Sequence, residues 1–140
     1  NTCTKCAIHV RLRHGEPMMP MMEVLDAQTS SRVGEPVLVP MESAHVDVRE
    51  HMDKLTAECG IDTTRIIVLH VQNPCVPSID LVDMPGLRAD GEMQAKTKEV
   101  VRSHVQRYGA RSVYLLVVPA SERPNNSLAC ELIEELGIQD

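Results

Sequence analysis

The residues best suited to bind a ligand or take part in catalysis are Asp83 and Gly86, which stand three apart in the stretch SIDLVDMPGL at 78–87. Apolar residues lead up to Asp83 and Pro85-Gly86 breaks the run, so the pattern predicts a buried strand that ends at an acid. Ligands bind at the C-terminal tips of strands in open α/β sheets. A carboxylate there can hold the water shell of Mg²⁺, and a glycine N–H can donate to a terminal phosphate. The alternative is an ordinary strand end followed by a turn.

A second candidate lies near the start of the chain, in the segment CTKC at 3–6. The pair Cys3 and Cys6 has the spacing of half a zinc site or of a redox pair. The other cysteines supply no second pair at a suitable spacing. The favoured interpretation therefore gives the role to Thr4, whose hydroxyl stands on the loop before the first predicted strand and can reach a metal.

Composition limits the classes of function. The 140 residues suffice for one domain with a core. A net charge of -6 and the absence of Phe and Trp argue against a nucleic-acid surface. The odd number of cysteines, widely scattered and without a signal peptide, favours reduced thiols and a cytoplasmic location. No stretch approaches the roughly 20 apolar residues that span a bilayer.

Hydrophobic periodicity indicates an alternation of strands and helices. Strands are predicted at 7–13, 23–27, 36–39, 65–71, 79–83 and 112–118, and helices at 42–59, 92–108 and 125–136. The strand at 65–71 is close in sequence to the next one, which suggests a hairpin. From 79 onward the order strand, helix, strand, helix predicts a βαβ unit with a parallel sheet. The predicted class is α/β, with a mostly parallel sheet and an antiparallel edge strand.

Two nucleotide-binding motifs are absent from the sequence. No glycine precedes a Lys-Ser or Lys-Thr pair, so there is no Walker A phosphate loop. There is also no Asn/Thr-Lys-x-Asp stretch, the usual reader of a guanine base.

In combination, three segments resemble the GTPase domain of the dynamin family. IDLVDMPGL at 79–87 is similar to that family's strand and Asp-Leu-Pro-Gly loop, with Met84 in place of Leu. SVYLLVVPASERPNNSLACEL at 112–132 is similar to the following strand and the entry to the next helix. CTKCAIHVRL at 3–12 is similar to the Thr-Arg-Arg-Pro segment and its strand, with Thr4 as the switch threonine. Lys5 and Cys6-Ala7 depart from that pattern.

The resemblance implies a three-layer P-loop GTPase-like domain, incomplete here, that binds GTP and Mg²⁺. Residues 1–140 would run from the first switch through the helix before the guanine-specificity motif. Thr4 would coordinate Mg²⁺ and position the attacking water through its main-chain carbonyl. Asp83 would hold the metal through water, and Pro85 and Gly86 would form the loop that senses the γ-phosphate. The segment from Leu87 through the second helix would be the second switch.

Three hypotheses follow. The first is the middle part of a Mg²⁺-dependent GTPase whose longer protein self-assembles through this domain and contacts membranes through other parts. Such a protein would be cytoplasmic or peripheral to membranes, and the 140 residues alone would neither bind nor hydrolyse GTP appreciably. The second is a catalytically inactive GTPase-like scaffold for protein–protein contacts. The third is a small metal or redox module that uses Cys3 and Cys6.

Overall fold

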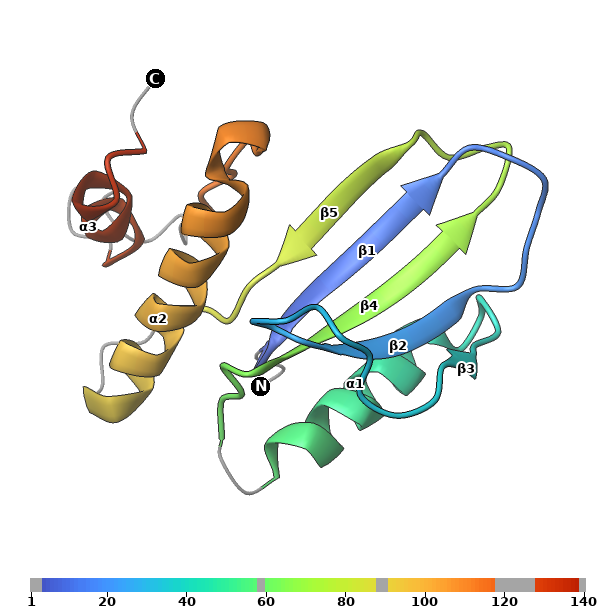
Figure 1. Cartoon of the computed structure of the whole chain (residues 1–140), viewed down its shortest axis with the longest axis horizontal. Helices are drawn as coiled ribbons and strands as arrows, with labels where there is room; N and C mark the ends of the chain where they lie inside the picture. The colour runs from blue at the N-terminus through green and yellow to red at the C-terminus, as the bar shows by residue number, and fades with distance from the viewer. Residues whose placement is uncertain (1–3, 58–59, 88–90, 118–127, 139–140) are drawn as a thin grey trace. The chain divides into compact units, whose positions relative to one another are not determined.

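The chain folds into two units, one up to Gly86 and one from Leu87 onward, and each is described by itself. The computed structural model describes residues 4–57, 60–87, 91–117 and 128–138. The first unit holds β1 (Ala7–Arg13), β2 (Met21–Asp26), β3 (Val37–Leu38), α1 (Ala44–Thr56), β4 (Arg65–Gln72) and β5 (Ile79–Asp83). The second unit holds α2 (Gly91–Tyr108), the short 3₁₀ helix η1 (Gly109–Arg111) and α3 (Leu128–Glu135) (Figure 1).

The strands of the first unit form one sheet in the order β3-β2-β4-β1-β5. Only β1 and β4 are parallel neighbours, whereas β2–β3, β2–β4 and β1–β5 are antiparallel. The predicted antiparallel edge strand is confirmed, but the prediction of a mostly parallel sheet is wrong for the described strands. The short connections that follow β1 and β4 reverse the chain, so β2 and β5 run opposite to both of these strands. The parallel pair β1 and β4 is joined by a long segment that contains α1, as a crossover between parallel strands requires.

The predicted hairpin of β4 and β5 does not form, because β1 lies between the two strands. The turn that joins them passes the end of β1 instead. The Asn73 N–H donates to the Arg13 carbonyl at 3.1 Å, and the His14 N–H donates to Ser78 Oγ at 3.1 Å. Closeness in sequence therefore gave the wrong neighbour, since the edge of β4 was already taken by β1.

The core lies between α1 and one face of the sheet. Ala44 and Met52 of α1 are buried there against Met22 of β2 and Ile67 and Leu69 of β4. The spacing of Ala44, Val48 and Met52 places them on one face of the helix, and this face meets the sheet. The helix is shorter than predicted at both described ends, running from 44 to 56, and the predicted terminal residue Cys59 lies outside the described residues.

The strand β5 is an exposed edge strand rather than the buried strand that its apolar run predicts. Ile79 is 46% exposed and Leu81 is 49% exposed. Its single strand neighbour in the described part of the chain is β1. Apolar residues on both faces are typical of a strand that has a neighbour on each side and is covered on both faces. Among the described residues, β5 has a strand neighbour on one side only, and its apolar side chains remain about half exposed.

The segment 112–117 was predicted as the next strand, and the structure contradicts this. It forms no strand pairing, and Val113, Leu115 and Val117 are 100%, 89% and 82% exposed. A strand needs a partner for its backbone hydrogen bonds, and residues 112–117 make no such pairing. The predicted βαβ unit therefore lacks its second strand among the described residues, and residue 118 lies outside them.

The second unit is built on α2 and α3. Thr97 and Val100 of α2 and Leu132 of α3 are its buried residues among those described. Glu135 of α3 accepts hydrogen bonds from Arg102 at 2.8 Å and from Lys98 at 3.4 Å, which links the two helices. Both predicted helices are thus confirmed over 91–108 and 128–135, while 125–127 lie outside the description. No described helix is long and apolar enough to cross a membrane.

A buried carboxylate ties β2 to its surroundings on the sheet face that does not carry α1. Glu23 is 7% exposed, and it accepts hydrogen bonds from His70 Nε2 at 2.7 Å and Arg32 Nε at 2.8 Å. Burial alone would raise the pKa of Glu23, but the hydrogen bonds from His70 and Arg32 together outweigh it. The pKa of Glu23 therefore lies below its ordinary value.

This depressed pKa predicts an acid-sensitive contribution of Glu23 to stability. The contribution is present above the unfolded-state pKa of Glu23 and is lost as the pH falls through the folded-state value. We expect Glu23→Gln to lower the free energy of unfolding at pH 7 by roughly 1–3 kcal/mol. The difference between variant and parent should shrink on acidification, as measured by urea unfolding at pH 7 and near pH 3. A difference of constant size at both pH values would contradict the prediction.

Candidate functional site

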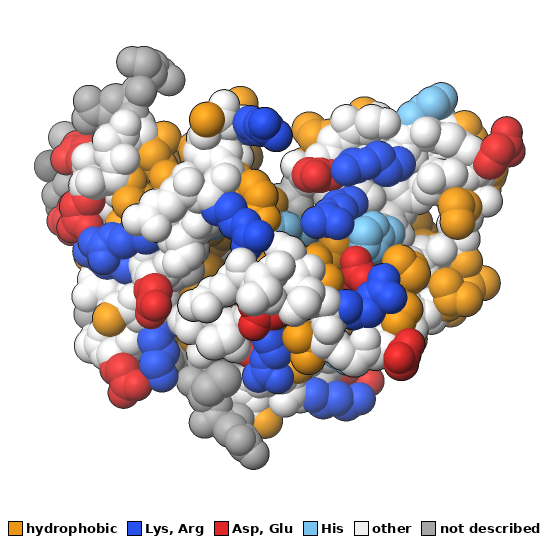
Figure 2. All heavy atoms as spheres, viewed as in Figure 1, with side chains coloured by type: hydrophobic (Ala, Val, Ile, Leu, Met, Phe, Trp, Pro, Cys, Tyr) orange, Lys and Arg blue, Asp and Glu red, His pale blue; other side chains and the backbone are white. Residues whose placement is uncertain are grey.

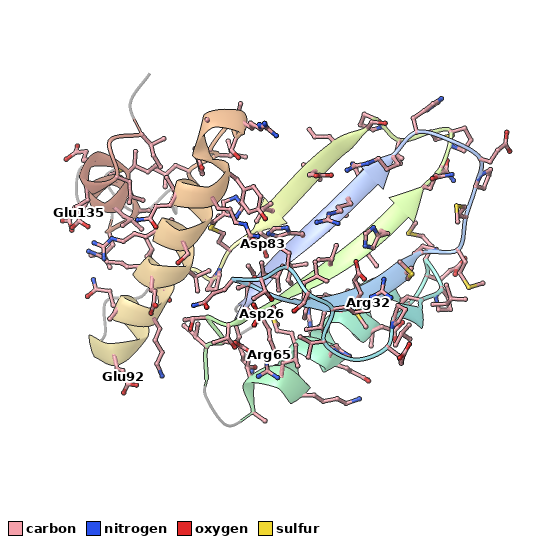
Figure 3. The ribbon with its side chains drawn as sticks, in the orientation of Figure 1. Asp26, Arg32, Arg65, Asp83, Glu92 and Glu135 are labelled. Carbon is pink, nitrogen blue, oxygen red and sulfur yellow. The ribbon has the colours of Figure 1, made fainter. Side chains whose placement is uncertain are left out.

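The structure brings together two of the predicted site residues, Thr4 and Asp83. The Thr4 hydroxyl donates a hydrogen bond of 2.7 Å to Asp83 Oδ2 across 79 positions of sequence. Asp83 is the last residue of β5, and its ladder partner is Ile8 near the start of β1 (Figure 3). Because the two strands are antiparallel, the end of β5 lies beside the beginning of β1. The loop that carries Thr4 leads into β1 at that same point.

Lys5 fixes the backbone next to Thr4. The Lys5 N–H donates to Met52 Sδ at 3.2 Å, and the Lys5 ammonium pairs with Asp53 at 2.6 Å. The Lys5 carbonyl accepts from the Asp62 N–H at 2.9 Å. Lys5 thus connects the candidate site to α1 and to the loop that follows α1.

Asp62 in turn fixes that loop. Its side chain is nearly fully buried and accepts hydrogen bonds from the Thr64 hydroxyl and N–H, both at 2.8 Å, and from the Arg65 N–H at 3.1 Å. The Arg65 guanidinium also pairs with Asp62 and donates to the Leu55 carbonyl at 2.9 Å (Figure 3). The buried carboxylate, with its hydrogen bonds formed, holds the start of β4 to the end of α1. It thereby also fixes the backbone of Asp62, which binds the Lys5 carbonyl.

Gly86 lies in the loop that follows β5, two residues after Met84. Gly86 is exposed, whereas Pro85 before it is buried. A Cβ added at Gly86 would meet nothing within 4 Å, and Gly86 is not among the glycines with positive φ. Neither packing around a Cβ nor a positive φ therefore explains a glycine at this position.

The side chains at this site suit a hard divalent cation in part. Thr4 and Asp83 offer hydroxyl and carboxylate oxygens, which are the ligand atoms that Mg²⁺ prefers. In nucleotide sites Mg²⁺ retains several waters and takes phosphate oxygens as further ligands. The protein therefore needs to supply only one or two oxygens of the coordination sphere. Among the described residues no three His, Cys, Asp or Glu side chains cluster as a self-contained metal site.

The alternative with Cys3 and Cys6 finds no support in the described residues. Cys6 is fully buried in the core between α1 and the sheet. Cys3 lies outside the described residues. A structural zinc site needs four ligands, and no three His, Cys, Asp or Glu side chains cluster among the described residues.

The sequence did not reveal a cavity of about 470 Å³ that adjoins Thr4. Ile8 and Val10 of β1 line one side of it, and Val48 and Arg49 of α1 line the other. Periodicity predicted this strand and this helix, but it carries no signal for a gap between them. Arg49 lines the same cavity as Thr4 and brings a positive charge to it. The sequence alone did not single out Arg49.

Comparison with known proteins agrees with the sequence resemblance. No curated protein matches the chain. The model of the dynamin family matches residues 1–139, nearly the whole length, and thereby includes both segments that meet at Thr4 and Asp83. The chain therefore belongs to the dynamin family, whose N-terminal domain is a GTP-binding GTPase domain.

Proposed function

We propose that the chain supplies the part of a Mg²⁺-dependent GTPase site that holds the metal and senses the γ-phosphate. The observation that carries the proposal is the 2.7 Å hydrogen bond from Thr4 to Asp83, which joins two residues 79 positions apart. The contact holds a hydroxyl and a carboxylate together at the end of the sheet where β5 stops and β1 begins. The same pair supplies two hard oxygens beside the open loop at Gly86.

In this proposal each residue has a separate task. Asp83 would hold the metal through its water shell, and Thr4 would supply its hydroxyl as a ligand and its main-chain carbonyl to position the attacking water. The Gly86 N–H donates to a phosphate oxygen, and Pro85 keeps the loop in place. Bound Mg²⁺ would neutralise charge that develops on the phosphates. The segment from Leu87 through α2 would act as the second switch, ordered by GTP.

The remaining parts of the proposal concern a longer protein. We propose that the complete GTPase domain has three layers and contains the phosphate loop and the guanine reader that this sequence lacks. The longer protein would self-assemble through this domain, remodel membranes through other parts, and reside in the cytoplasm or at a membrane surface. The family match supports GTP binding and hydrolysis, and the finer statements rest on the resemblance.

A second candidate function is a catalytically inactive scaffold for protein contacts. The observation that favours it is the absence of Gly-x-x-x-x-Gly-Lys-Ser/Thr and Asn/Thr-Lys-x-Asp from these 140 residues. A scaffold would retain the Thr4–Asp83 contact as a structural bond.

Nucleotide binding separates the two candidates. We expect the 140-residue chain to show no micromolar binding of a fluorescent GTP analogue, because most phosphate and base contacts are missing. A form extended at both ends by its natural flanking sequence should bind the analogue in the presence of Mg²⁺ and hydrolyse GTP. Failure of the extended form to bind would favour the scaffold. Micromolar binding by the 140 residues would contradict the incomplete-site proposal.

A further inference from the structure

The strand β3 offers an open backbone edge on the far side of the sheet from β5. The Val39 N–H donates to the Pro20 carbonyl at 2.8 Å, so the backbone N–H and C=O of Val39 point toward β2. Backbone groups alternate in direction along an antiparallel strand, and Leu38 therefore directs its N–H and C=O away from β2. In the described part of the chain, no strand lies on that side of β3. Leu38 thus presents one donor and one acceptor to an incoming strand.

Exposed apolar side chains surround this edge. Val37 and Leu38 of β3 are 47% and 63% exposed, and Met18, Met19 and Met41 are each exposed by more than half. Pairing of Met21 with Leu38 places the methionine-rich loop next to β3. Figure 2 shows hydrophobic side chains gathered on the surface at the β3 side of the sheet. Flexible methionines suit a surface that adapts to a bound chain.

A groove of about 350 Å³ lies between β3 and α1. Val37 and Val39 of the β3 segment and Met22 of β2 form its apolar side. Asp47 and Glu50 of α1 stand along the opposite wall. The groove therefore combines an apolar side next to an open strand edge with two carboxylates along its other wall.

The charge of this groove is negative at neutral pH. Burial, and then the nearby Lys54, lower the pKa of His51, so the imidazole remains neutral. Lys54 is then the single lining cation against Asp47 and Glu50. Asp47 accepts a hydrogen bond from Ser43, whereas Glu50 forms no ion pair within the described ranges. An occupant with a positive charge would complement Glu50.

We propose that β3 and the groove beside α1 bind an extended segment of another protein, with a Lys or Arg flanked by apolar residues. The segment adds as a strand along Leu38, its cation points into the groove and pairs with Glu50, and its flanking apolar side chains pack on the opposite face of the sheet beside Leu38. A second copy of the chain fits less well, because it would bring the same carboxylates to the same edge on a chain with a net charge of -6. This surface lies apart from Thr4 and Asp83 and does not rest on the proposed GTPase activity.

The test uses a synthetic peptide, acetyl-Ser-Val-Lys-Val-Lys-Val-Ser-amide, titrated into the ¹⁵N-labelled chain and followed by NMR. We expect shifts of the Val37, Leu38 and Glu50 amides, with a Kd on the order of 0.1–1 mM for so short a ligand. Glu50→Gln should weaken binding by about threefold or more, as an ion pair at a partly exposed groove implies. Glu131→Gln, the same change at an exposed position of α3, is the matched control and should bind like the parent.

A second variant tests the backbone contact. Leu38→Pro removes the outward N–H without touching the bonds to β2 and should abolish the shifts, whereas Leu38→Ala retains the N–H and should keep most of the affinity. No shifts up to millimolar peptide, or equal binding of the peptide with Glu in place of Lys, would overturn the proposal. Octylammonium that binds as well as the peptide would assign the groove to small molecules instead. A concentration-dependent dimer that Leu38→Pro dissolves would assign it to a second copy.

Discussion

Replacement of Ile67 by alanine is expected to destabilise the first unit by about 2–5 kcal/mol. Ile67 is the largest of the fully buried side chains among the described residues, and it lies in the central strand β4, within the cluster that α1 covers. Its removal takes away the transfer free energy of the lost carbons and leaves a cavity that a sheet with neighbours on both sides cannot close. Since domains are stable by only about 5–15 kcal/mol, this loss consumes a large share of the total.

Ile79→Ala is the matched control, because it makes the same chemical change on the same sheet. Ile79 lies on the edge strand β5 and is 46% exposed, so we expect a loss of roughly 1 kcal/mol or less. Urea unfolding followed by far-UV circular dichroism would measure both, with equal m values required for a valid comparison. Equal losses for the two variants would mean that the core does not lie where the structure places it.

The elements that the sequence predicts well are those whose residues carry their own periodicity. The spacing of Ala44, Val48 and Met52 is a property of one helix, and so is the alternation in β1. Both patterns report that one face is apolar, and the structure buries those faces together. Local patterns of this kind are set by burial on one side and need no knowledge of which element provides the cover.

The arrangement of the strands is a different matter, because it depends on partners that the pattern does not name. The run SVYLLV predicts a strand covered on both sides, yet the described chain leaves Val113 fully exposed. The run before Asp83 gives a strand, but an edge strand. An apolar run indicates that its side chains favour burial. It does not indicate which element covers them, or whether such an element is present.

The candidate site shows the same division. Thr4 and Asp83 could be selected by residue type and by their place at the ends of predicted strands, and the structure places them in contact. The supports could not be selected in this way. Lys5 reaches α1, and Asp62 binds the backbone at the start of β4, through contacts that exist only once the chain has folded.

The second large effect is expected at Asp83. In the extended form of the protein, Asp83→Asn should lower the kcat for GTP by about 10²–10³-fold, the usual cost of removing one oriented electrostatic group. The asparagine oxygen can still accept the hydrogen bond from Thr4, so the local geometry is retained while the charge that would hold the metal shell is lost. The apparent Mg²⁺ requirement should rise in parallel, which a Mg²⁺ titration of steady-state GTP hydrolysis would measure.

Asp80→Asn is the control for this prediction, because Asp80 stands on the same strand, three residues earlier. Its carboxylate pairs with Arg13 at 2.6 Å instead of with Thr4, and both side chains are about half exposed. We therefore expect hydrolysis within about twofold of the parent, since exposed ion pairs contribute little. Thr4→Ser, which keeps the hydroxyl, should likewise retain most of the activity that Thr4→Ala loses. If Asp80→Asn slowed hydrolysis as much as Asp83→Asn, the effect would belong to the stability of β5, and the assignment of Asp83 to the metal would be wrong.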